Sequence, residues 1–311
     1  MVYVLVSHLG ERLEAITGEM ISAARSLGPV TAVVVGPKDF AKELGALGVK
    51  TIVHAPAPDQ RLIIPTVDVL SGLAEVEPAP IVVPKSVSGN EIAGRLAARL
   101  GSGVLIDVVG INPDGSARQS IFGDTTDVVS VAGGDCPIYA LRPGAVEADQ
   151  AAATTPQVVQ TSVPAAGPMD VRVTEFKAAV HGSRPELTEA GVVVAGGRGL
   201  GSAAGFQDLA ESLADYFGGA VGATRDVVDE GWYDGAFQVG QTGATVSPDL
   251  YVALGISGAI QHKSGMQTSK KIVAINNDED APIFEIADFG IVGDVHEVVP
   301  QLLEKLSSRE R

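Results

Sequence analysis

Short aliphatic runs alternate with helix-like segments along the first hundred residues, and this alternation is the feature that most constrains the fold. Runs such as Val2–Val6 and Thr31–Val35 are rich in valine and end at turn residues. Runs of this kind are typical of strands that are buried on both faces of a parallel sheet. Between them, Glu11–Leu27 has apolar residues at helical spacing. The alternation predicts a doubly wound α/β layer.

The first half of the chain is predicted to hold five such strands and four helices, followed by an antiparallel extension. The predicted strands are Val2–Val6, Val30–Val35, Thr51–His54, Pro80–Val83 and Val104–Val108. The predicted helices are Glu11–Leu27, Phe40–Leu47, Arg61–Ala74 and Gly89–Leu100. The extension is expected because three strand-like runs follow without helices between them: Gln119–Phe122, Asp127–Ala132 and Cys136–Leu141.

A Pro-, Ala- and Thr-rich stretch, residues 145–168, interrupts the pattern and predicts an extended arm. One more strand is predicted over Asp170–Phe176, and a new α/β unit begins at Gly191. Because 311 residues suffice for two cores, we predict an α/β domain over 1–185 and a second over 186–311. The elements predicted in the second are strands Val192–Ala195, Ala220–Ala223, Leu250–Leu254, Lys271–Ile275 and Ile283–Ile286, and helices Ala203–Phe217 and Val295–Leu306.

The formal net charge of −16 argues against nucleic acid or an anionic membrane surface as a partner, since both attract lysine and arginine. We interpret the acidity as an aid to solubility, with docking through acidic patches as the alternative. The single cysteine, Cys136, cannot form an internal disulfide or a multi-cysteine metal site. No apolar run approaches the ~18 residues of a membrane-spanning helix, and the first residues lack a signal-peptide pattern. We therefore expect a soluble, cytoplasmic protein without direct membrane insertion.

A glycine-rich loop follows the strand Val192–Ala195, and it is the strongest local motif. Gly196-Gly197-Arg198-Gly199 leads into a helix near Ala203. Glycines allow the backbone to approach a ligand closely, and amides at the start of a helix favour an anion. The motif predicts a phosphate or pyrophosphate beside Arg198 and Gly199. Its spacing is not the G-x-G-x-x-G of nicotinamide sites, and a tight turn without a ligand is the alternative.

Two further loops carry polar side chains at places where a ligand is expected. Thr224 and Arg225 follow the strand Ala220–Ala223, and carboxyl ends of parallel strands face one crevice. A surface ion pair of Arg225 with Asp226 or Asp229 is the alternative. The loop Gln238–Gly243 has amides, a hydroxyl and two glycines but no ionisable group. It is unsuited to acid–base catalysis and suited to a heterocycle, with a polar hairpin as the alternative.

A fourth block begins with the strand Leu250–Leu254, which runs through Gly-Ile-Ser-Gly into a short helix with Gln261 and His262. A lone histidine is usually structural, but its place after a strand-to-helix turn favours a ligand contact. Asn276 and Asp294 also end apolar runs. Ser257 lacks the spacing of G-x-S-x-G, and neither a P-loop nor H-E-x-x-H occurs. Five scattered histidines argue against a metal centre.

Together these blocks resemble the alpha subunit of electron-transfer flavoproteins. The stretch LYVALGISGAIQHKSGMQTSKKIVAIN, residues 250–276, is similar to that family's signature almost position for position. Gly196–Leu200, Val239–Gly243 and Ala281–Asp294 lie around it in the family's order. The first half of the chain is similar mainly in layout, through Ile138–Ala140 and Arg172–Phe176.

The resemblance implies a nucleotide-hydrolase-like layer in the first domain and a Rossmann-like domain that binds one FAD in the second. It implies an electron carrier rather than an enzyme, paired with a beta subunit that completes the site and carries AMP. Such carriers take electrons from soluble dehydrogenases, for example the acyl-CoA dehydrogenases of fatty acid β-oxidation, and pass them to a membrane quinone reductase.

The resemblance also implies roles for individual residues. Arg198 and Gly199 would lie at the phosphates and the adenosine side, and Thr224 would lie beside the flavin. Arg225 would lie over the isoalloxazine ring, where its charge favours the reduced flavin. Thr242 would bond N5 and His262 would lie near the C2 carbonyl. The predicted cofactor-binding residues are Arg198, Gly199, Thr224, Arg225, Gln238, Val239, Gly240, Gln241, Thr242, Gly243, Ser257, Gly258, Ala259, Ile260, Gln261, His262, Asn276, Asp294 and Val295.

Some positions depart from the common family pattern. Lys263 and Ser264 replace an apolar and a small residue, which adds a charge near the flavin edge, and Phe289 stands where tyrosine is frequent. One extra residue is expected near Ala203–Gly205. Two other functions stay open at this point: a nucleotide-binding regulatory module without redox chemistry, and an enzyme that uses a nicotinamide or thiamine-type cofactor. The enzyme would require a catalytic residue pair, which the motifs do not contain.

Overall fold

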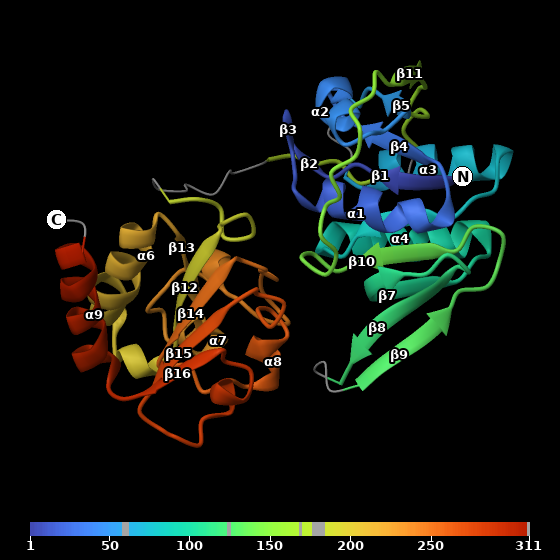
Figure 1. The fold of residues 1–311 in the computed structure, drawn as a ribbon. Helices are drawn as coiled ribbons and strands as arrows, with labels where there is room; N and C mark the ends of the chain where they lie inside the picture. Colours follow the sequence, from blue (N-terminus) through green and yellow to red (C-terminus); the bar gives the residue numbers. More distant parts are fainter. Residues whose placement is uncertain (58–61, 123–125, 168–169, 176–183, 310–311) are drawn as a thin grey trace. The chain divides into compact units, whose positions relative to one another are not determined.

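The computed structural model describes residues 1–57, 62–122, 126–167, 170–175 and 184–309. The chain divides into two compact units, Met1–Lys177 and Ala178–Arg311, each with its own sheet and helices (Figure 1). The predicted two-domain α/β fold is confirmed. The domain boundary expected after residue 185 lies a few residues beyond this division, and residues 176–183 are outside the described part.

In the described part of the first unit, nine strands form one sheet in the order β11-β5-β4-β1-β6-β10-β7-β8-β9. The pairs from β11 to β7 are parallel, and only the pairs β7–β8 and β8–β9 are antiparallel. The strands are β1 (Val2–Leu5), β4 (Val30–Val35), β5 (Thr51–Ala55), β6 (Ile81–Pro84), β7 (Val104–Ile111), β8 (Ser116–Ile121), β9 (Thr126–Val131), β10 (Ile138–Leu141) and β11 (Gln157–Gln160).

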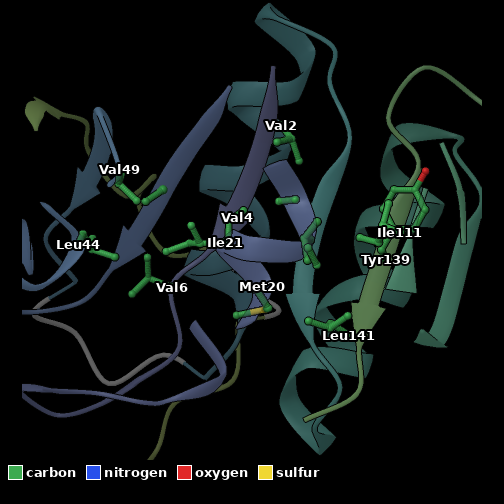
Figure 2. Close-up of a cluster of buried hydrophobic side chains, with 14 of the residues drawn as sticks. Val2, Val4, Val6, Met20, Ile21, Leu44, Val49, Ile111, Tyr139 and Leu141 are labelled. Carbon is green, nitrogen blue, oxygen red and sulfur yellow. The ribbon is translucent and has the colours of Figure 1, made fainter. Parts of the chain in front are cut away.

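Helices cover both faces of this sheet, because successive side chains of a strand point to opposite faces. Val2 and Val4 belong to one buried cluster with Met20 of α1 and Leu44 of α2 (Figure 2), whereas Tyr3 belongs to the cluster on the other face, with α3 and α4. The helices are α1 (Ile16–Ala24), α2 (Ala41–Ala46), α3 (Ile64–Val76) and α4 (Val87–Leu100). The aliphatic runs are therefore buried on both faces, as their composition predicted.

Three predictions for the first unit are wrong. The helix expected over 11–27 starts only at Ile16, because β2 (His8–Leu9) and β3 (Arg12–Leu13) form a hairpin that turns at Gly10, with φ of 59°. Cys136–Leu141 does not extend the antiparallel ribbon. Its strand, β10, pairs in parallel with both β6 and β7, since side chains buried on both faces belong in the sheet interior.

The third error is the strand expected over 170–176. The described residues 170–175 contain a single bridge, at Arg172, and Val171 is 57% exposed. Phe176, the end of that prediction, lies outside the described residues. The arm predicted over 145–168 instead supplies β11, which adds a parallel strand beside β5, and Thr154 donates its backbone N–H to Gly45 (2.9 Å). The arm is thus partly a component of the first core.

In the second unit, five strands form a parallel sheet in the order β13-β12-β14-β15-β16. The strands are β12 (Val192–Gly196), β13 (Ala220–Ala223), β14 (Leu250–Leu254), β15 (Ile272–Asn276) and β16 (Phe289–Val292). The strand expected over 283–286 is wrong, because Pro282 starts a 3-10 turn over Pro282–Glu285, and the edge strand follows it.

One long helical segment and α9 (Val295–Arg309) pack on one face of this sheet. The segment joins α5 (Ala203–Gly205), a π-helical stretch (Phe206–Glu211) and α6 (Ser212–Phe217). A π-helical stretch is the form in which a helix accommodates one extra residue. The short helices α7 (Arg225–Asp229) and α8 (Ile260–Lys263) follow β13 and β14.

Candidate functional site

A cleft of about 1000 Å³ lies at the carboxyl ends of the five strands of the second unit. Its lining includes Gly197 after β12, Thr224 after β13, Gly255 after β14, Asn276 at the end of β15 and Gly293 after β16. The order of the sheet reverses at β12, whose two neighbours are β13 and β14. Ligands of open α/β sheets bind at such a switch point. The topology therefore makes this cleft the candidate site.

Sixteen of the nineteen predicted site residues line the cleft. They are Arg198, Gly199, Thr224, Arg225, Gln238, Val239, Gly240, Gln241, Thr242, Ser257, Ala259, Gln261, His262, Asn276, Asp294 and Val295. The other three, Gly243, Gly258 and Ile260, do not line it. Gly243 closes the turn of its loop by donating to the carbonyl of Gly240 (3.0 Å), and Gly258 packs against the backbone of Ile283.

Ten residues that line the cleft were not predicted from the sequence. They are Gly197, Asp226, Asp229, Gly255, Ile256, Asn277, Asp278, Ala281, Pro282 and Gly293. Five of them, Gly197, Asp226, Ile256, Asn277 and Gly293, are direct chain neighbours of a predicted residue, so the rule of strand ends could have found these five. Asp229 is different, because it reaches the cleft from the next turn of α7, and only the helical spacing from Arg225 would have indicated it.

Two glycine loops of the cleft lie directly against each other. The N–H of Gly199 donates to the carbonyl of Gly255 (3.1 Å), and a Cβ at Gly199 would lie 2.6 Å from the Cα of Gly255. Gly255 itself has φ of 60°, a conformation that favours glycine. These glycines were expected mainly to let the backbone reach a phosphate. The contacts show that they first allow the loops after β12 and β14 to pack together.

Both arginines of the cleft have weak, exposed partners. Arg225 lies 3.3 Å from Asp229, and Arg198 lies 3.3 Å from Asp226, with side chains that are 68% and 71% exposed. The surface ion pair weighed as the alternative for Arg225 thus exists, and Arg225 lines the cleft as well. Exposed pairs of this kind contribute roughly 0–1 kcal/mol. Either guanidinium can therefore exchange its carboxylate for a bound anion at little cost.

The loop Gln238–Gly243 is held against the start of α8. The N–H of Gln241 donates to the carbonyl of Gln261 (2.7 Å), and the Gln238 amide donates to the hydroxyl of Thr242 (2.9 Å). The backbone of Gly265 packs against Gly240 closely enough to leave no room for a side chain at position 265. The loop is therefore a fixed wall of the cleft rather than a free polar hairpin.

His262 is buried at the inner side of this wall. Its Nδ1 lies 3.1 Å from the carbonyl of Val239, and its Nε2 lies 2.9 Å from the hydroxyl of Tyr251. Burial lowers the pKa of His262 to about 4, against a smaller raising effect of the bond to Val239. The imidazole is therefore neutral near pH 7, and both ring nitrogens have partners inside the protein. His262 therefore has a structural role in the core and also lines the cleft.

Asn276 and Asp294 also make internal contacts. Asn276 donates from Nδ2 to the carbonyl of Ile256 (2.8 Å) and accepts from the N–H of Asp278 (3.0 Å). Asp294 accepts from the N–H of His296 (2.9 Å) and so caps α9. Each side chain fixes the loop that carries it, and the Asn276 amide keeps a second N–H that these bonds do not use. Lys263, the added charge, pairs with Glu285 (3.1 Å).

Within residues 1–309, apart from the undescribed gaps, no three His, Cys, Asp or Glu side chains gather as a metal site would require. Over the same residues, no helix has the length and apolar character needed to cross a membrane.

Comparisons with known proteins identify the family. Sequence models of the electron transfer flavoprotein domain and of the electron transfer flavoprotein FAD-binding domain match residues 2–166 and 186–267. The electron transfer flavoprotein subunit alpha of Mycobacterium tuberculosis is 54% identical over 316 residues, which cover 99% of both chains. The chain belongs to the family of electron transfer flavoprotein alpha subunits.

More distant members of the family match over nearly the same length. The subunit alpha of Mycobacterium leprae is 50% identical over 99% of this chain and 98% of its own, and that of Paracoccus denitrificans is 40% identical over 93% and 94%. The resemblance drawn from the sequence motifs is confirmed. The match to the FAD-binding domain lies in the unit that contains the cleft, and Asn276 and Asp294 lie beyond its last matched residue.

Proposed function

We propose that the chain binds one FAD in this cleft, as the flavin-carrying subunit of a heterodimeric electron carrier. The observation that carries the proposal is the convergence of five strand ends on one cleft, in a unit that matches a FAD-binding domain. A dinucleotide is long and must contact several loops at once, and a cleft of about 1000 Å³ is at the upper end of the usual size for ligand sites.

The polar groups of the cleft suit the parts of this cofactor. Arg198 would face the phosphates, where a guanidinium binds oxygen anions in a fork. Arg225 would lie near the flavin ring, and the amides and hydroxyl of Gln238, Gln241 and Thr242 would bond its carbonyls and nitrogens. The backbone N–H groups of residues 257–261 would contact the pyrophosphate, and Asn276 and Asp294 would contact the ribose and adenine.

The charges of the cleft favour electron transfer over proton abstraction. FAD, when bound, accepts and releases electrons singly or in pairs. The guanidinium of Arg225 stabilises negative charge near it and stays protonated throughout. Both ring nitrogens of His262 are hydrogen-bonded to other groups of the protein. Asp226 and Asp229 each pair with an arginine. This arrangement suits a carrier that performs no acid–base step.

A beta subunit would close the cleft, carry AMP and make the second wall of the flavin site. Two observations support a missing wall. Both arginines are about two-thirds exposed although they line the cleft. The lining holds four aspartates against two arginines, so an anionic cofactor needs further donors. We propose soluble dehydrogenases, such as acyl-CoA dehydrogenases, as electron donors, a membrane quinone reductase as acceptor, and the cytoplasm as the compartment.

An absorption spectrum of the purified heterodimer tests the cofactor. We expect the visible bands of oxidised flavin and their stepwise loss on titration with a reductant. A folded heterodimer that stays colourless and takes up no FAD would contradict the proposal. Reduction by an acyl-CoA dehydrogenase and its substrate, followed by reoxidation with a quinone reductase, tests the direction of electron flow.

A further inference from the structure

Tyr251 lies behind the cleft and does not line it, yet its hydroxyl reaches a residue that does. Tyr251, in the middle of the sheet on β14, is 0% exposed, and His262 of α8 is 6% exposed. The Tyr251 hydroxyl lies 2.9 Å from Nε2 of His262, and Nδ1 of the same ring lies 3.1 Å from the carbonyl of Val239. The imidazole thus joins β14, α8 and the loop Gln238–Gly243.

The protonation of this group follows from what each atom can do. A backbone carbonyl only accepts, so Nδ1 must carry a hydrogen and donate it to Val239. A neutral imidazole has one N–H, and Nε2 is then an acceptor. The Tyr251 hydroxyl must therefore donate to Nε2. Burial of His262 opposes the doubly protonated imidazolium. In that form Nε2 would carry a hydrogen, and the Tyr251 hydroxyl could only accept from it.

We propose that Tyr251 is a positioning residue, whose hydroxyl holds His262 in the neutral Nδ1–H form and so ties the loop Gln238–Gly243 to the sheet. The consequence for the cofactor rests on the proposed function. While Tyr251 donates to Nε2, the ring cannot donate a hydrogen bond to a flavin carbonyl. His262 then acts on the cleft through its shape and through the loop, rather than as a donor.

The tie adds to other contacts of the loop, which are made by its backbone and by the Val239 side chain, 2% exposed and packed in the core of the unit. Gln241 is bonded to Gln261, and Gly240 packs against the backbone of Gln261 and of Gly265. The His262 ring bonds the backbone carbonyl of Val239 and so fixes the direction of the loop beside this buried side chain. Loss of the Tyr251 hydroxyl would leave Nε2 buried without a donor, which costs more than an ordinary hydrogen bond contributes.

The state of the ring can be measured without a variant. Nitrogen-15 NMR of the heterodimer, with histidine labelled in this chain only, distinguishes protonated from unprotonated ring nitrogens. At pH 7 we expect one histidine with a protonated Nδ1 and an unprotonated, hydrogen-bonded Nε2. An Nε2–H form or a doubly protonated ring for His262 would overturn the proposal.

Tyr251→Phe and Tyr233→Phe form a matched pair of variants. Tyr233 is in the same unit, and its hydroxyl donates to Glu211 (3.0 Å), away from His262. We expect Tyr251→Phe to shift the Nε2 signal of His262 and to weaken FAD binding by more than about fivefold, the worth of one ordinary hydrogen bond. Tyr233→Phe should change neither. If Tyr251→Phe leaves the Nε2 signal in place, the proposal is wrong.

The outcomes for cofactor and tautomer are separable. A wild-type heterodimer that binds no FAD would remove the proposed function, while the NMR signals would still decide the state of His262. In Tyr251→Phe, a shifted Nε2 signal together with unchanged FAD affinity would show that Tyr251 fixes the tautomer of His262 but not the position of the loop Gln238–Gly243. That result would overturn the positioning role.

Discussion

Both units of the chain place charged side chains at the carboxyl ends of their strands, but the partners differ. In the first, Arg142 after β10 bonds Asp107 of β7 through two atoms (2.9 and 2.6 Å), and Arg142 is only 7% exposed. Burial would raise the pKa of Asp107, but the hydrogen bonds and charge of Arg142 hold it below its ordinary value. In the second, Arg198 and Arg225 make single, exposed contacts.

The difference separates charges that hold the fold from charges that can receive a ligand. Lys85, after β6, also lies 3.8 Å from the Asp107 carboxylate, so three strands of the first sheet are joined at this edge. A buried pair loses much stability when one partner is removed, whereas an exposed pair exchanges partners readily. The same strand layout therefore supports a closed edge in one unit and a cleft in the other.

The largest effect is expected where the cleft depends on close backbone contact. Gly255→Ala puts a Cβ against Gly199 at φ of 60°. Left-handed strain and overpacking together amount to about 4 kcal/mol, so we expect FAD binding to weaken close to a thousandfold, measured by titration of flavin fluorescence. Gly218→Ala is the control, because Gly218 has φ of 61° with nothing near its Cβ. Equal losses in both variants would contradict the role of loop packing.

A smaller effect is expected at the closed edge of the first unit. Asp107→Ala leaves Arg142 buried beside a lost carboxylate, and alanine tolerates the φ of 63° at this position less well than aspartate does. We expect the free energy of unfolding to fall by about 3 kcal/mol, measured by urea denaturation followed by circular dichroism.

Glu91→Ala is the comparison, since Glu91 pairs with Arg95 on an exposed helical surface. It should cost about 0.5 kcal/mol or less. If Asp107→Ala is no more harmful than Glu91→Ala, the ion pair of the first unit does not hold its edge, and the contrast between the two units fails.

The aliphatic runs predicted the strands well because burial on both faces needs little besides the local pattern. The ranges of β4, β13 and β14 agree with the predictions residue for residue. The place of β10 in the sheet could not be predicted in this way. Ile138–Leu141 pairs with β6 and β7, which are distant in the sequence, and the residues of a strand do not indicate which other strands it pairs with. The turn at Pro282 was missed because the apolar residues after it are also compatible with a strand.

The site was predictable to the extent that it follows strand ends. Polar residues after β12, β13 and β14 were identified because topology alone brings those ends together. The state of His262 could not be predicted, because its partner Tyr251 lies in a run that the sequence marks only as buried strand. The partners of the glycines were missed for the same reason, as a contact between two loops has no local signature.

The buried histidine of the second unit predicts a dependence of stability on pH. The pKa of His262 is about 4 in the folded chain and near 6.5 when unfolded. Between these values the unfolded chain binds the extra proton, so stability falls as the pH drops from 6.5 towards 4. From pH 7 to pH 5 the loss is about 2 kcal/mol.

His262→Gln should remove this part of the pH dependence, and urea denaturation at pH 7 and pH 5 measures it. The difference between the two pH values should be about 2 kcal/mol smaller in the variant than in the wild type. An unchanged difference would mean that His262 has the same pKa in the folded and the unfolded chain, contrary to its burial.

The smallest effect is expected at the exposed arginines, and it tests whether their partners are exchangeable. Asp229→Asn removes the carboxylate 3.3 Å from Arg225 and leaves more positive charge near the proposed flavin position. An exposed pair is worth about 0.5 kcal/mol, so the one-electron midpoint potential should rise by about 20 mV. Asp226→Asn removes the same charge from the same helix beside Arg198, at the proposed phosphate side. It should tighten FAD binding with a smaller change of potential. Equal shifts of potential in both variants, measured by redox titration, would mean that the helix acts only through its total charge and that Arg225 has no special place at the flavin.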